Sequence, residues 1–347
     1  RSELLPMFVP IMVETALEVR TAWESHPKDK PIDILHEMAK MTARIIGRTV
    51  FGDDVPEDEA AQTVRGFSKY QKTVEQMSLA DCCGLPALKM FTNPYKRWKT
   101  RRSARDVQEV IDRIIERRAT TGASQPHSLL DLFFQHDAAS GKCPMSKNAA
   151  RNESIVMFMA GHETTANTLA WAWYLLDGKP EARGRLQQEI KSVLDGRLPT
   201  FDDVPKLVYT KAVIEETLRL YPPVPILSRQ ARRGDRVGSK EVDPGTIIVA
   251  IPWLLQRHKL YWDKPDEFVP ERFMPDQPRP DKCLYFPFSV GPRVSLGLRF
   301  GLTESILCLA ILSQKFAPRL KPGHKVKIDC RLTLRPGERL PMILDPA

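Results

Sequence analysis

The stretch FPFSVGPRVSLG, residues 286–297, passes from a stiff aromatic–proline–aromatic start through a glycine–proline turn toward an apolar segment. Proline restricts the backbone at the start, and the Gly-Pro pair at 291–292 is typical of a turn. The residues from 295 to 309 are largely apolar and predict a helix. We therefore expect the loop to present one side chain, that of Ser295, at the start of a helix.

Length and composition describe an ordinary soluble globular protein. The 347 residues include 42% hydrophobic, 27% charged and 8% aromatic residues, with neither disordered nor collagen-like bias. No clean division of the chain is visible, which predicts a single domain over 1–347. The formal net charge of +9 predicts a mildly basic surface, with docking of an acidic protein as the alternative. No nucleic-acid-binding motif of the usual kinds is present.

Cysteine usage and hydropathy indicate a cytoplasmic protein. Six cysteines show neither metal-ligand spacing nor a dense disulfide framework, which favours reduced thiols. The adjacent Cys82-Cys83 pair lacks the spacing of a thioredoxin-type motif and predicts packing. No uninterrupted apolar run reaches about 18 residues, so we expect no transmembrane helix in the sequence. Because the sequence opens with Arg1 and not with methionine, a membrane anchor upstream stays open as an alternative.

Hydrophobic periodicity predicts a mainly helical body with a small β portion after a proline-rich stop. The predicted helices cover residues 4–23, 32–51, 57–76, 104–119, 129–134, 148–176, 181–194 and 206–220. Prolines at 222, 223 and 225 end the last of these helices. Short strand-like runs follow at 225–229, 246–251, 325–333 and 340–344. The helix at 148–176 is apolar on most sides, which predicts that it is central and buried.

The central helix contains Ala160-Gly161-His162-Glu163-Thr164-Thr165, which weakens it in the middle. Glycine costs about 1 kcal/mol against alanine in a helix, and threonine is β-branched. One interpretation is a local opening where a ligand approaches the backbone, with the Glu163 carboxylate and the Thr164 hydroxyl available to pass protons. The alternative is tight packing against a neighbouring helix, with Glu163 solvated.

Two later motifs combine opposite charges. Glu216 and Arg219 are three residues apart on one predicted helix face, a spacing typical of an exposed surface pair. Arg272, within Pro-Glu-Arg-Phe at 270–273, offers a second arginine that would complete a buried three-member ion network. In such a network the removal of one partner costs far more than it does at a surface.

The order and spacing of these motifs, with the loop pattern Phe288-x-x-Gly291-x-Arg293, resemble the cytochrome P450 superfamily of haem-thiolate monooxygenases. The resemblance covers most of the chain. It implies a mainly α fold with a small β portion, and a haem b-dependent oxidoreductase that acts on an apolar small molecule. It also implies an acidic ferredoxin or flavoprotein as electron donor, which a basic surface favours. About a quarter of a usual family domain, at the N-terminal end, has no counterpart in the sequence.

The resemblance also implies roles for individual positions. Thr164 and Glu163 match the oxygen-activating and proton-delivering pair, whereas His162 matches a variable position and is expected to pack within the helix. Arginines of the family bind haem propionates, because a planar guanidinium suits a carboxylate. The positions implied in haem binding are Ala160, Gly161, Arg229, Phe288, Gly291, Arg293 and Gly297. The charged motifs match a buried structural ion triad of Glu216, Arg219 and Arg272, and residues 333–337 resemble a hairpin that touches substrate.

Ser295 occupies the position of the family's axial cysteine, which implies that Ser295 is the protein ligand of the iron. The nearest cysteine in sequence, Cys308, lies well along the following predicted helix. A cysteine at a helix N-terminus is readily kept as thiolate, whereas a serine hydroxyl is far less acidic. Serine therefore predicts weak iron ligation or a water in its place, impaired monooxygenation and an altered reduction potential. The alternatives are a haem-binding pseudoenzyme that acts as carrier or sensor, a haem-free helical fragment, and an engineered serine-ligated carbene or nitrene transferase.

Overall fold

The computed structural model describes residues 4–52, 62, 66, 94–121, 128–134 and 145–347. The predicted helix at 57–76 lies almost wholly outside the described residues, and Cys82 and Cys83 lie outside them altogether. In the part of the chain that is described, no helix is both long enough and apolar enough to cross a membrane.

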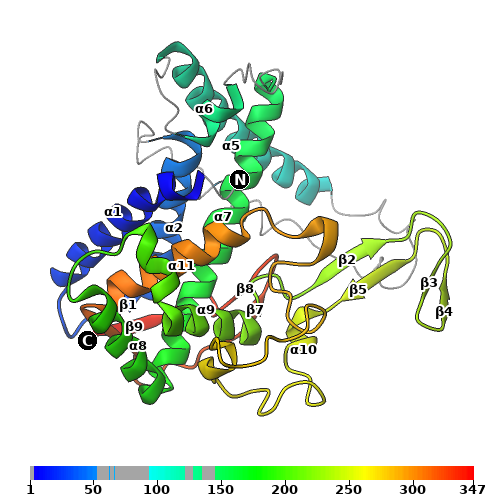
Figure 1. Cartoon of the computed structure of the whole chain (residues 1–347). Helices are drawn as coiled ribbons and strands as arrows, with labels where there is room; N and C mark the ends of the chain where they lie inside the picture. Colours follow the sequence, from blue (N-terminus) through cyan, green and yellow to red (C-terminus); the bar gives the residue numbers. More distant parts are fainter. Residues whose placement is uncertain (1–3, 53–61, 63–65, 67–93, 122–127, 135–144) are drawn as a thin grey trace.

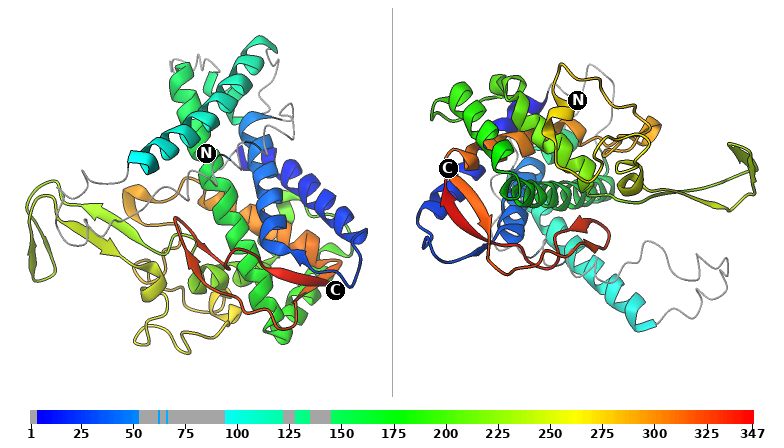
Figure 2. Two further views of the ribbon diagram at one scale, coloured as in Figure 1. Left: turned by 180° about the vertical axis from the view of Figure 1, so that it is seen from behind. Right: turned by 90° about the horizontal axis from the view of Figure 1, so that it is seen from below.

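One long helix, α7 (Lys147–Asp177), runs through the middle of the molecule (Figures 1 and 2). It starts where the Ser146 side chain accepts a hydrogen bond from the backbone N–H of Ala149, which is the preferred way to satisfy a free donor at a helix start. Its 31 residues correspond to a length of about 46 Å. The predicted central helix at 148–176 is therefore confirmed.

Other helices surround α7, and their bounds agree with the predicted ranges to within two residues except at the start of α5. They are α1 (Leu5–Glu24), α2 (Ile34–Phe51), α5 (Pro94–Thr121), α6 (Leu129–Phe134), α8 (Pro180–Leu194) and α9 (Val208–Leu220). Helix α11 (Leu298–Ser313) follows the loop at 286–297, and the short α10 (Pro252–Leu255) was not predicted. The 3₁₀ helices η3 (Phe201–Lys206), η4 (Pro270–Phe273) and η5 (Gly291–Arg293) lie between these elements in the described residues.

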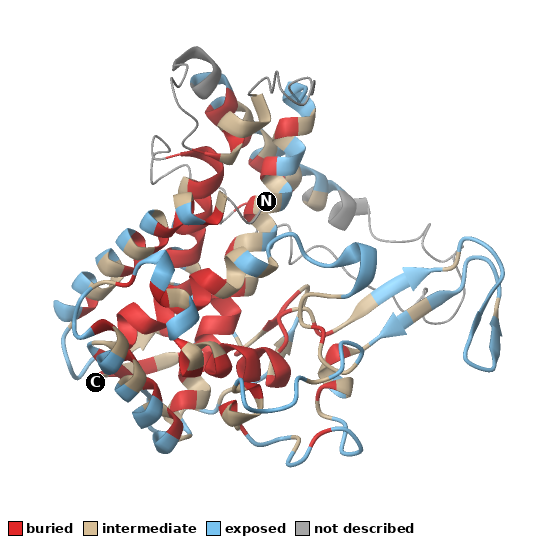
Figure 3. Ribbon diagram, in the orientation of Figure 1, coloured by how far each residue is buried: buried red, intermediate tan, exposed pale blue. Residues whose placement is uncertain are grey.

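Three apolar core clusters are present in the described residues, and the two larger ones share α2 and α7. The largest joins α1, α2, the C-terminal half of α7, α8, α9 and α11, and the second joins α2, α5 and the N-terminal half of α7. Buried residues accordingly follow α7, α9 and α11 in Figure 3. A fully buried Leu, Ile, Phe or Met side chain stabilises the fold by about 1.5–3 kcal/mol relative to an exposed one. Because both halves of α7 are packed in the core, the helix is held in place. The polar residues at 160–165 are therefore held in place as well.

The β portion consists of small antiparallel sheets. One has the strand order β1 (Ile32–Asp33), β9 (Pro341–Pro346), β6 (Phe316–Leu320), and it joins the two ends of the described chain. The others are two-stranded, and they pair β2 (Leu227–Gln230) with β5 (Ile247–Ala250), β3 (Asp235–Val237) with β4 (Lys240–Val242), and β7 (Asp329–Cys330) with β8 (Leu334–Arg335). Strands β2 and β5 extend from the body and carry the β3–β4 hairpin at their far end (Figures 1 and 2).

Besides the start of α5, which lies ten residues before the predicted one, two predicted boundaries are wrong. The run at 325–333 is not one strand, because the chain turns at 331–333 and returns as β8, with the Arg331 N–H donating to the Thr333 carbonyl. The helix predicted to begin at 295 begins at Leu298 and continues to Ser313. The N–H of Ser295 bonds to the Phe288 carbonyl, which is not a helical partner, so the loop and not the helix holds this residue.

Candidate functional site

The loop before α11 turns sharply and then returns on itself. Ser289 and Gly291 have positive φ values of 64° and 67°. The N–H of Ser295 donates to the carbonyl of Phe288 at 2.9 Å, which closes the loop. Gly291 is needed here for its backbone, because glycine adopts positive φ without steric cost. The loop therefore presents Ser295 in a fixed position, three residues before the first residue of α11.

The oxygen of Ser295 lies beside the start of α11. Its Oγ accepts a hydrogen bond from the backbone N–H of Gly297 at 3.2 Å, and Gly297 is the N-cap of α11. Backbone N–H groups at a helix start favour negative charge on a neighbouring atom. The residue is exposed, so a metal ion could reach the Ser295 side chain.

The loop that carries Ser295 has exposed apolar and basic side chains. Val290, Val294 and Leu296 are exposed, and Leu296 retains 95% of its accessible surface. Arg293 in η5 is exposed as well, and so is Arg229 on the separate strand β2. Neither guanidinium forms an ion pair with another residue in the described ranges, so both are available to a carboxylate.

Gly161 lies where α7 approaches α2. A Cβ at this position would be 2.8 Å from Cγ1 of Ile46, closer than real side chains approach. The helix is uninterrupted at 160–165, and the Thr164 hydroxyl donates to the Ala160 carbonyl at 2.7 Å. These contacts favour the packing alternative for Gly161 over a local opening of the helix. The predicted place of Ala160 and Gly161 beside the haem stays a prediction.

The Glu163 carboxylate is not simply solvated. Its Oε1 accepts a hydrogen bond of 2.8 Å from the hydroxyl of Thr333, in the turn between β7 and β8. The same hydroxyl oxygen accepts a hydrogen bond of 3.1 Å from Nδ2 of Asn167. The structure thus brings the C-terminal hairpin to the predicted proton-delivering residue, over a sequence separation of 170.

His162 packs inside the helix pair, as the sequence indicated. Its ring lies 5.4 Å from the Phe158 ring, and its carbonyl accepts a hydrogen bond of 2.7 Å from the Thr42 hydroxyl of α2. Burial lowers the pKa of His162, which keeps the imidazole neutral. Within the described ranges no group of three or more His, Cys, Asp or Glu side chains is arranged to hold a metal ion.

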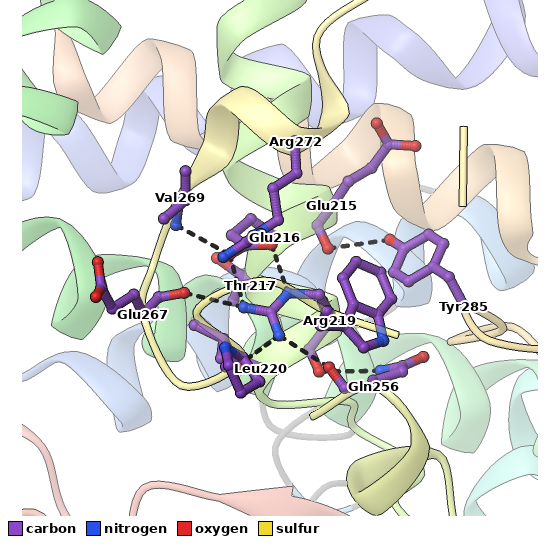
Figure 4. A network of polar contacts seen from close by, with 12 residues as sticks. Glu215, Glu216, Thr217, Arg219, Leu220, Gln256, Glu267, Val269, Arg272 and Tyr285 are labelled. Atoms are coloured by element: carbon purple, nitrogen blue, oxygen red, sulfur yellow. Dashed lines mark hydrogen bonds and ion pairs between the residues drawn. The ribbon is translucent and has the colours of Figure 1, made fainter. Parts of the chain in front are cut away.

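The predicted ion triad is present and buried (Figure 4). The Glu216 carboxylate accepts hydrogen bonds of 2.7 and 2.8 Å from the Arg219 guanidinium, and both side chains have no exposed surface. Arg272 approaches the same carboxylate to 3.4 Å. The remaining Arg219 donors bond to three backbone carbonyls, those of Gln256, Pro265 and Glu267. Each of the five N–H donors of the buried Arg219 guanidinium therefore has an acceptor.

The network continues to the beginning of the loop that carries Ser295. The buried Gln256 side chain donates to the carbonyls of Leu218 and Arg219 at 3.0 Å. Its Oε1 accepts a hydrogen bond of 3.2 Å from the N–H of Phe286. Gln256 was not predicted, because a single glutamine after a short helix has no distinctive pattern in sequence.

A buried carboxyl group in α11 was also missed. Glu304 is fully buried and faces the Thr165 hydroxyl of α7. This hydroxyl lowers the pKa of the carboxyl group and so opposes part of the rise that burial causes. No hydrogen bond of good geometry to either carboxyl oxygen is present among the described residues. Burial raises the pKa of Glu304 well above its ordinary value, so the group is neutral in the fold. The signal in the sequence was a single acidic residue inside the apolar run at 298–313.

Substitution Glu304→Gln is expected to stabilise the protein at pH 8 and to have little effect near pH 4. The folded state keeps the Glu304 proton while the unfolded state loses it, so each pH unit above the unfolded-state pKa costs about 1.4 kcal/mol until the folded-state pKa is reached. Glutamine does not titrate. Denaturant titrations at the two pH values measure the effect, with the exposed Glu18→Gln as control. An equal pH dependence in Glu304→Gln and wild type would contradict the burial of a neutral carboxyl.

The described cysteines do not supply a ligand at the Ser295 position. Cys308 is fully buried in α11, and burial raises the pKa of its thiol well above the ordinary value. Cys283 and Cys330 are exposed free thiols.

Comparisons with known proteins agree with these observations. The family model for cytochrome P450 matches residues 2–340. Cyclooctatin synthase of Streptomyces melanosporofaciens is 31% identical over 94% of this chain and 70% of its own length. Cyclooctat-9-en-7-ol 5-monooxygenase of the same organism is 30% identical over 98% of this chain and 73% of its own length. Putative cytochrome P450 132 of Mycobacterium tuberculosis is 36% identical over 67% of this chain, and the match spans about half of that relative (51%).

The fold agrees as well. The crystal structure of the cytochrome P450DA heme domain superposes with a TM-score of 0.85 at 23% identity, over 100% of this chain and 75% of the other. The mainly helical architecture with a small sheet portion is thus the P450 fold. The match of the family model over nearly the whole chain, together with relatives above 30% identity, shows that this chain belongs to the cytochrome P450 family.

Proposed function

We propose that the chain binds haem b between residues 160–164 of α7 and the loop at 288–297, and oxidises an apolar small molecule. The family and the monooxygenase among the similar proteins support this reaction type. The observation that carries the proposal is the closed loop before α11, which presents the Ser295 oxygen beside the N–H of Gly297. The proposal treats residues 1–347 as one haem domain.

The residues fit an iron porphyrin. The exposed Val290, Val294 and Leu296 provide an apolar surface that a flat macrocycle would cover, and Arg229 and Arg293 would hold its propionates. When bound, haem supplies the oxygen activation that amino-acid side chains cannot. Ser295 would provide the protein oxygen on the side of α11, where the Gly297 N–H favours partial negative charge.

Ser295 redirects or weakens this chemistry in our proposal. A thiolate donates electron density that favours cleavage of the O–O bond, and a serine hydroxyl donates much less. We therefore expect native monooxygenation to be slow and the reduction potential to differ from that of thiolate-ligated relatives.

Thr164 and Glu163 are the residues that we propose to hold and move protons. The Thr164 hydroxyl donates its hydrogen bond to the Ala160 carbonyl. Its lone pairs can therefore accept a hydrogen bond from a bound water or substrate. Glu163 lies next to it in sequence, and its Oε1 accepts the hydrogen bond from the Thr333 hydroxyl. A carboxylate in this position can take up a proton from solvent and return it to the site.

Electrons are proposed to come from an acidic ferredoxin or a flavoprotein. The net charge of +9 favours encounter with an acidic partner, because opposite charges steer association. The rate of reduction by such a partner should fall as ionic strength rises.

Replacement of Thr164 by Ala is expected to lower product formed per electron consumed by on the order of 100-fold, because a positioned proton-transfer group contributes about that much. The matched control is Thr168→Ala, one turn further along α7, whose hydroxyl donates to the Thr164 carbonyl at 2.9 Å. Product and electron consumption are measured with a chemical or protein reductant after loading with hemin. Unchanged coupling in Thr164→Ala would remove this residue from the mechanism. A preparation that stays colourless after hemin addition would refute haem binding itself.

A further inference from the structure

We propose that Thr333 is a positioning residue, which holds the Glu163 carboxylate in one orientation and connects the C-terminal hairpin to proton delivery. The inference rests on the proposed role of Glu163. It deepens that role by naming the group that sets the position of the carboxylate. The supporting contacts come from two elements that lie 170 residues apart in sequence.

The direction of the hydrogen bonds is fixed by chemistry. The amide nitrogen of Asn167 can only donate, and it donates to the Thr333 hydroxyl oxygen at 3.1 Å. The hydroxyl can donate one hydrogen bond, and it donates this bond to Oε1 of Glu163 at 2.8 Å. Asn167 thereby orients Thr333, and Thr333 orients Glu163. The chain of donors ends on the carboxylate.

The hairpin turn is itself anchored on the same face of α7. Glu163, Asn167 and Trp171 follow one another at intervals of four residues, which places them along one side of the helix. The indole N–H of Trp171 donates to the Leu334 carbonyl at 3.3 Å. The N–H of Leu334 in turn donates to the Pro223 carbonyl at 2.9 Å.

The anchor is rigid as well as specific. Trp171 is fully buried and stacks on Tyr221, with ring centroids 3.8 Å apart and planes inclined by 4°. Thr333 retains only 5% of its accessible surface, and Asn167 retains 2%. The Thr333 hydroxyl therefore does not follow the motion of an exposed loop. The hairpin holds the hydroxyl within hydrogen-bonding distance of Glu163, so a shift of the hairpin would move the hydroxyl with it.

The contact favours one orientation of the carboxylate. A hydrogen bond to a charged group is worth more than one between neutral groups and shifts an equilibrium by about tenfold or more. Without the Thr333 hydroxyl, the held orientation of Glu163 should be about tenfold less populated. Proton delivery depends on this orientation, because a carboxylate passes a proton only to a group that it faces.

The test compares Thr333→Val, which keeps the shape and removes the hydroxyl, with Thr333→Ser, which keeps the hydroxyl. The matched control is Thr49→Val, because Thr49 is buried and its hydroxyl makes no hydrogen bond to another described residue. Infrared spectra of the full chain show the carboxylate stretch of Glu163, assigned by subtraction of a Glu163→Gln spectrum. Product formed per electron is measured on the hemin-loaded protein. Far-UV circular dichroism checks folding, and Thr333→Ala replaces Thr333→Val if the valine variant does not fold.

In Thr333→Val we expect the hydrogen-bonded component of the Glu163 band to fall about tenfold and coupling to fall with it. Thr333→Ser should restore both, and Thr49→Val should change neither. An unchanged band in Thr333→Val, or a failure of serine to restore it, would overturn the inference. A shifted band with unchanged coupling in both Thr333→Val and Glu163→Gln would retain the positioning contact and overturn the proton-delivering role of Glu163.

Discussion

Replacement of Glu216 by Ala is expected to remove about 3–5 kcal/mol of stability, because it leaves the Arg219 guanidinium buried without its counterion. The total stability of a domain is about 5–15 kcal/mol, so the variant should lose a large fraction of its free energy of unfolding. The backbone carbonyls around Arg219 supply dipoles but no net charge. They cannot replace the carboxylate.

The effect should extend beyond the triad. Glu216 also accepts a hydrogen bond of 2.9 Å from the N–H of Val269, so its loss frees the chain that leads into η4. Through Arg219 and Gln256 the network reaches Phe286, at the entrance to the loop that carries Ser295. A partly folded variant should therefore lose hemin binding before it loses helical circular dichroism.

Unfolding in denaturant measures the change, and Glu18→Ala is the control. Glu18 forms an ion pair of 2.7 Å with Arg44, but both side chains are 46% exposed, so its loss should cost at most about 1 kcal/mol. If the two variants differ by less than 1 kcal/mol, the buried pair does not stabilise the fold as proposed.

Periodicity predicted the helices well because most of them bury one face against α7 or α11. Residues 148–176, for example, were predicted almost to the residue, since apolar positions continue to both ends of α7. The start of α11 was placed too early because the apolar pattern begins inside the loop. Backbone bonds such as that from Ser295 to Phe288, which determine the true start, have no pattern in sequence.

Strands were harder to predict. The β3–β4 hairpin was missed because its residues are mostly exposed and polar, so no apolar alternation marks them. Strand β6 was missed because its buried residues follow α11 directly and its Pro318 argues against a strand.

The candidate site divides in the same way. Ser295, Glu163 and the ion triad were named from the resemblance to the P450 superfamily, which rests on the joint order and spacing of several motifs. The contacts that Thr333 and Gln256 make could not be predicted, because each depends on segments that only the fold brings together. Glu304 carried a signal, a lone acid in an apolar helix, whose meaning depends on how completely α7 covers it.

Replacement of Ser295 by Cys is expected to give the largest change in chemistry. A model thiol ionises with a pKa of about 8.5, whereas the pKa of an aliphatic hydroxyl lies far above this value, close to that of water. The Gly297 N–H and the start of α11, which now face the Ser295 oxygen, would favour a thiolate still further. The loop needs no rearrangement, because the two side chains differ by one atom.

We expect the reduced carbon monoxide spectrum of Ser295→Cys to show the band of thiolate-ligated haem, and that of wild type to lack it. Product formation with a reductant should rise at least about tenfold, which corresponds to about 1.4 kcal/mol in the barrier. Ser192→Cys, at an exposed position on α8, is the control and should behave as wild type. A thiolate band in wild type would show that another residue ligates the iron. An unchanged spectrum in Ser295→Cys would show that the loop before α11 does not face the iron. The thiolate band is the decisive measurement, because it arises only when the sulfur binds the metal.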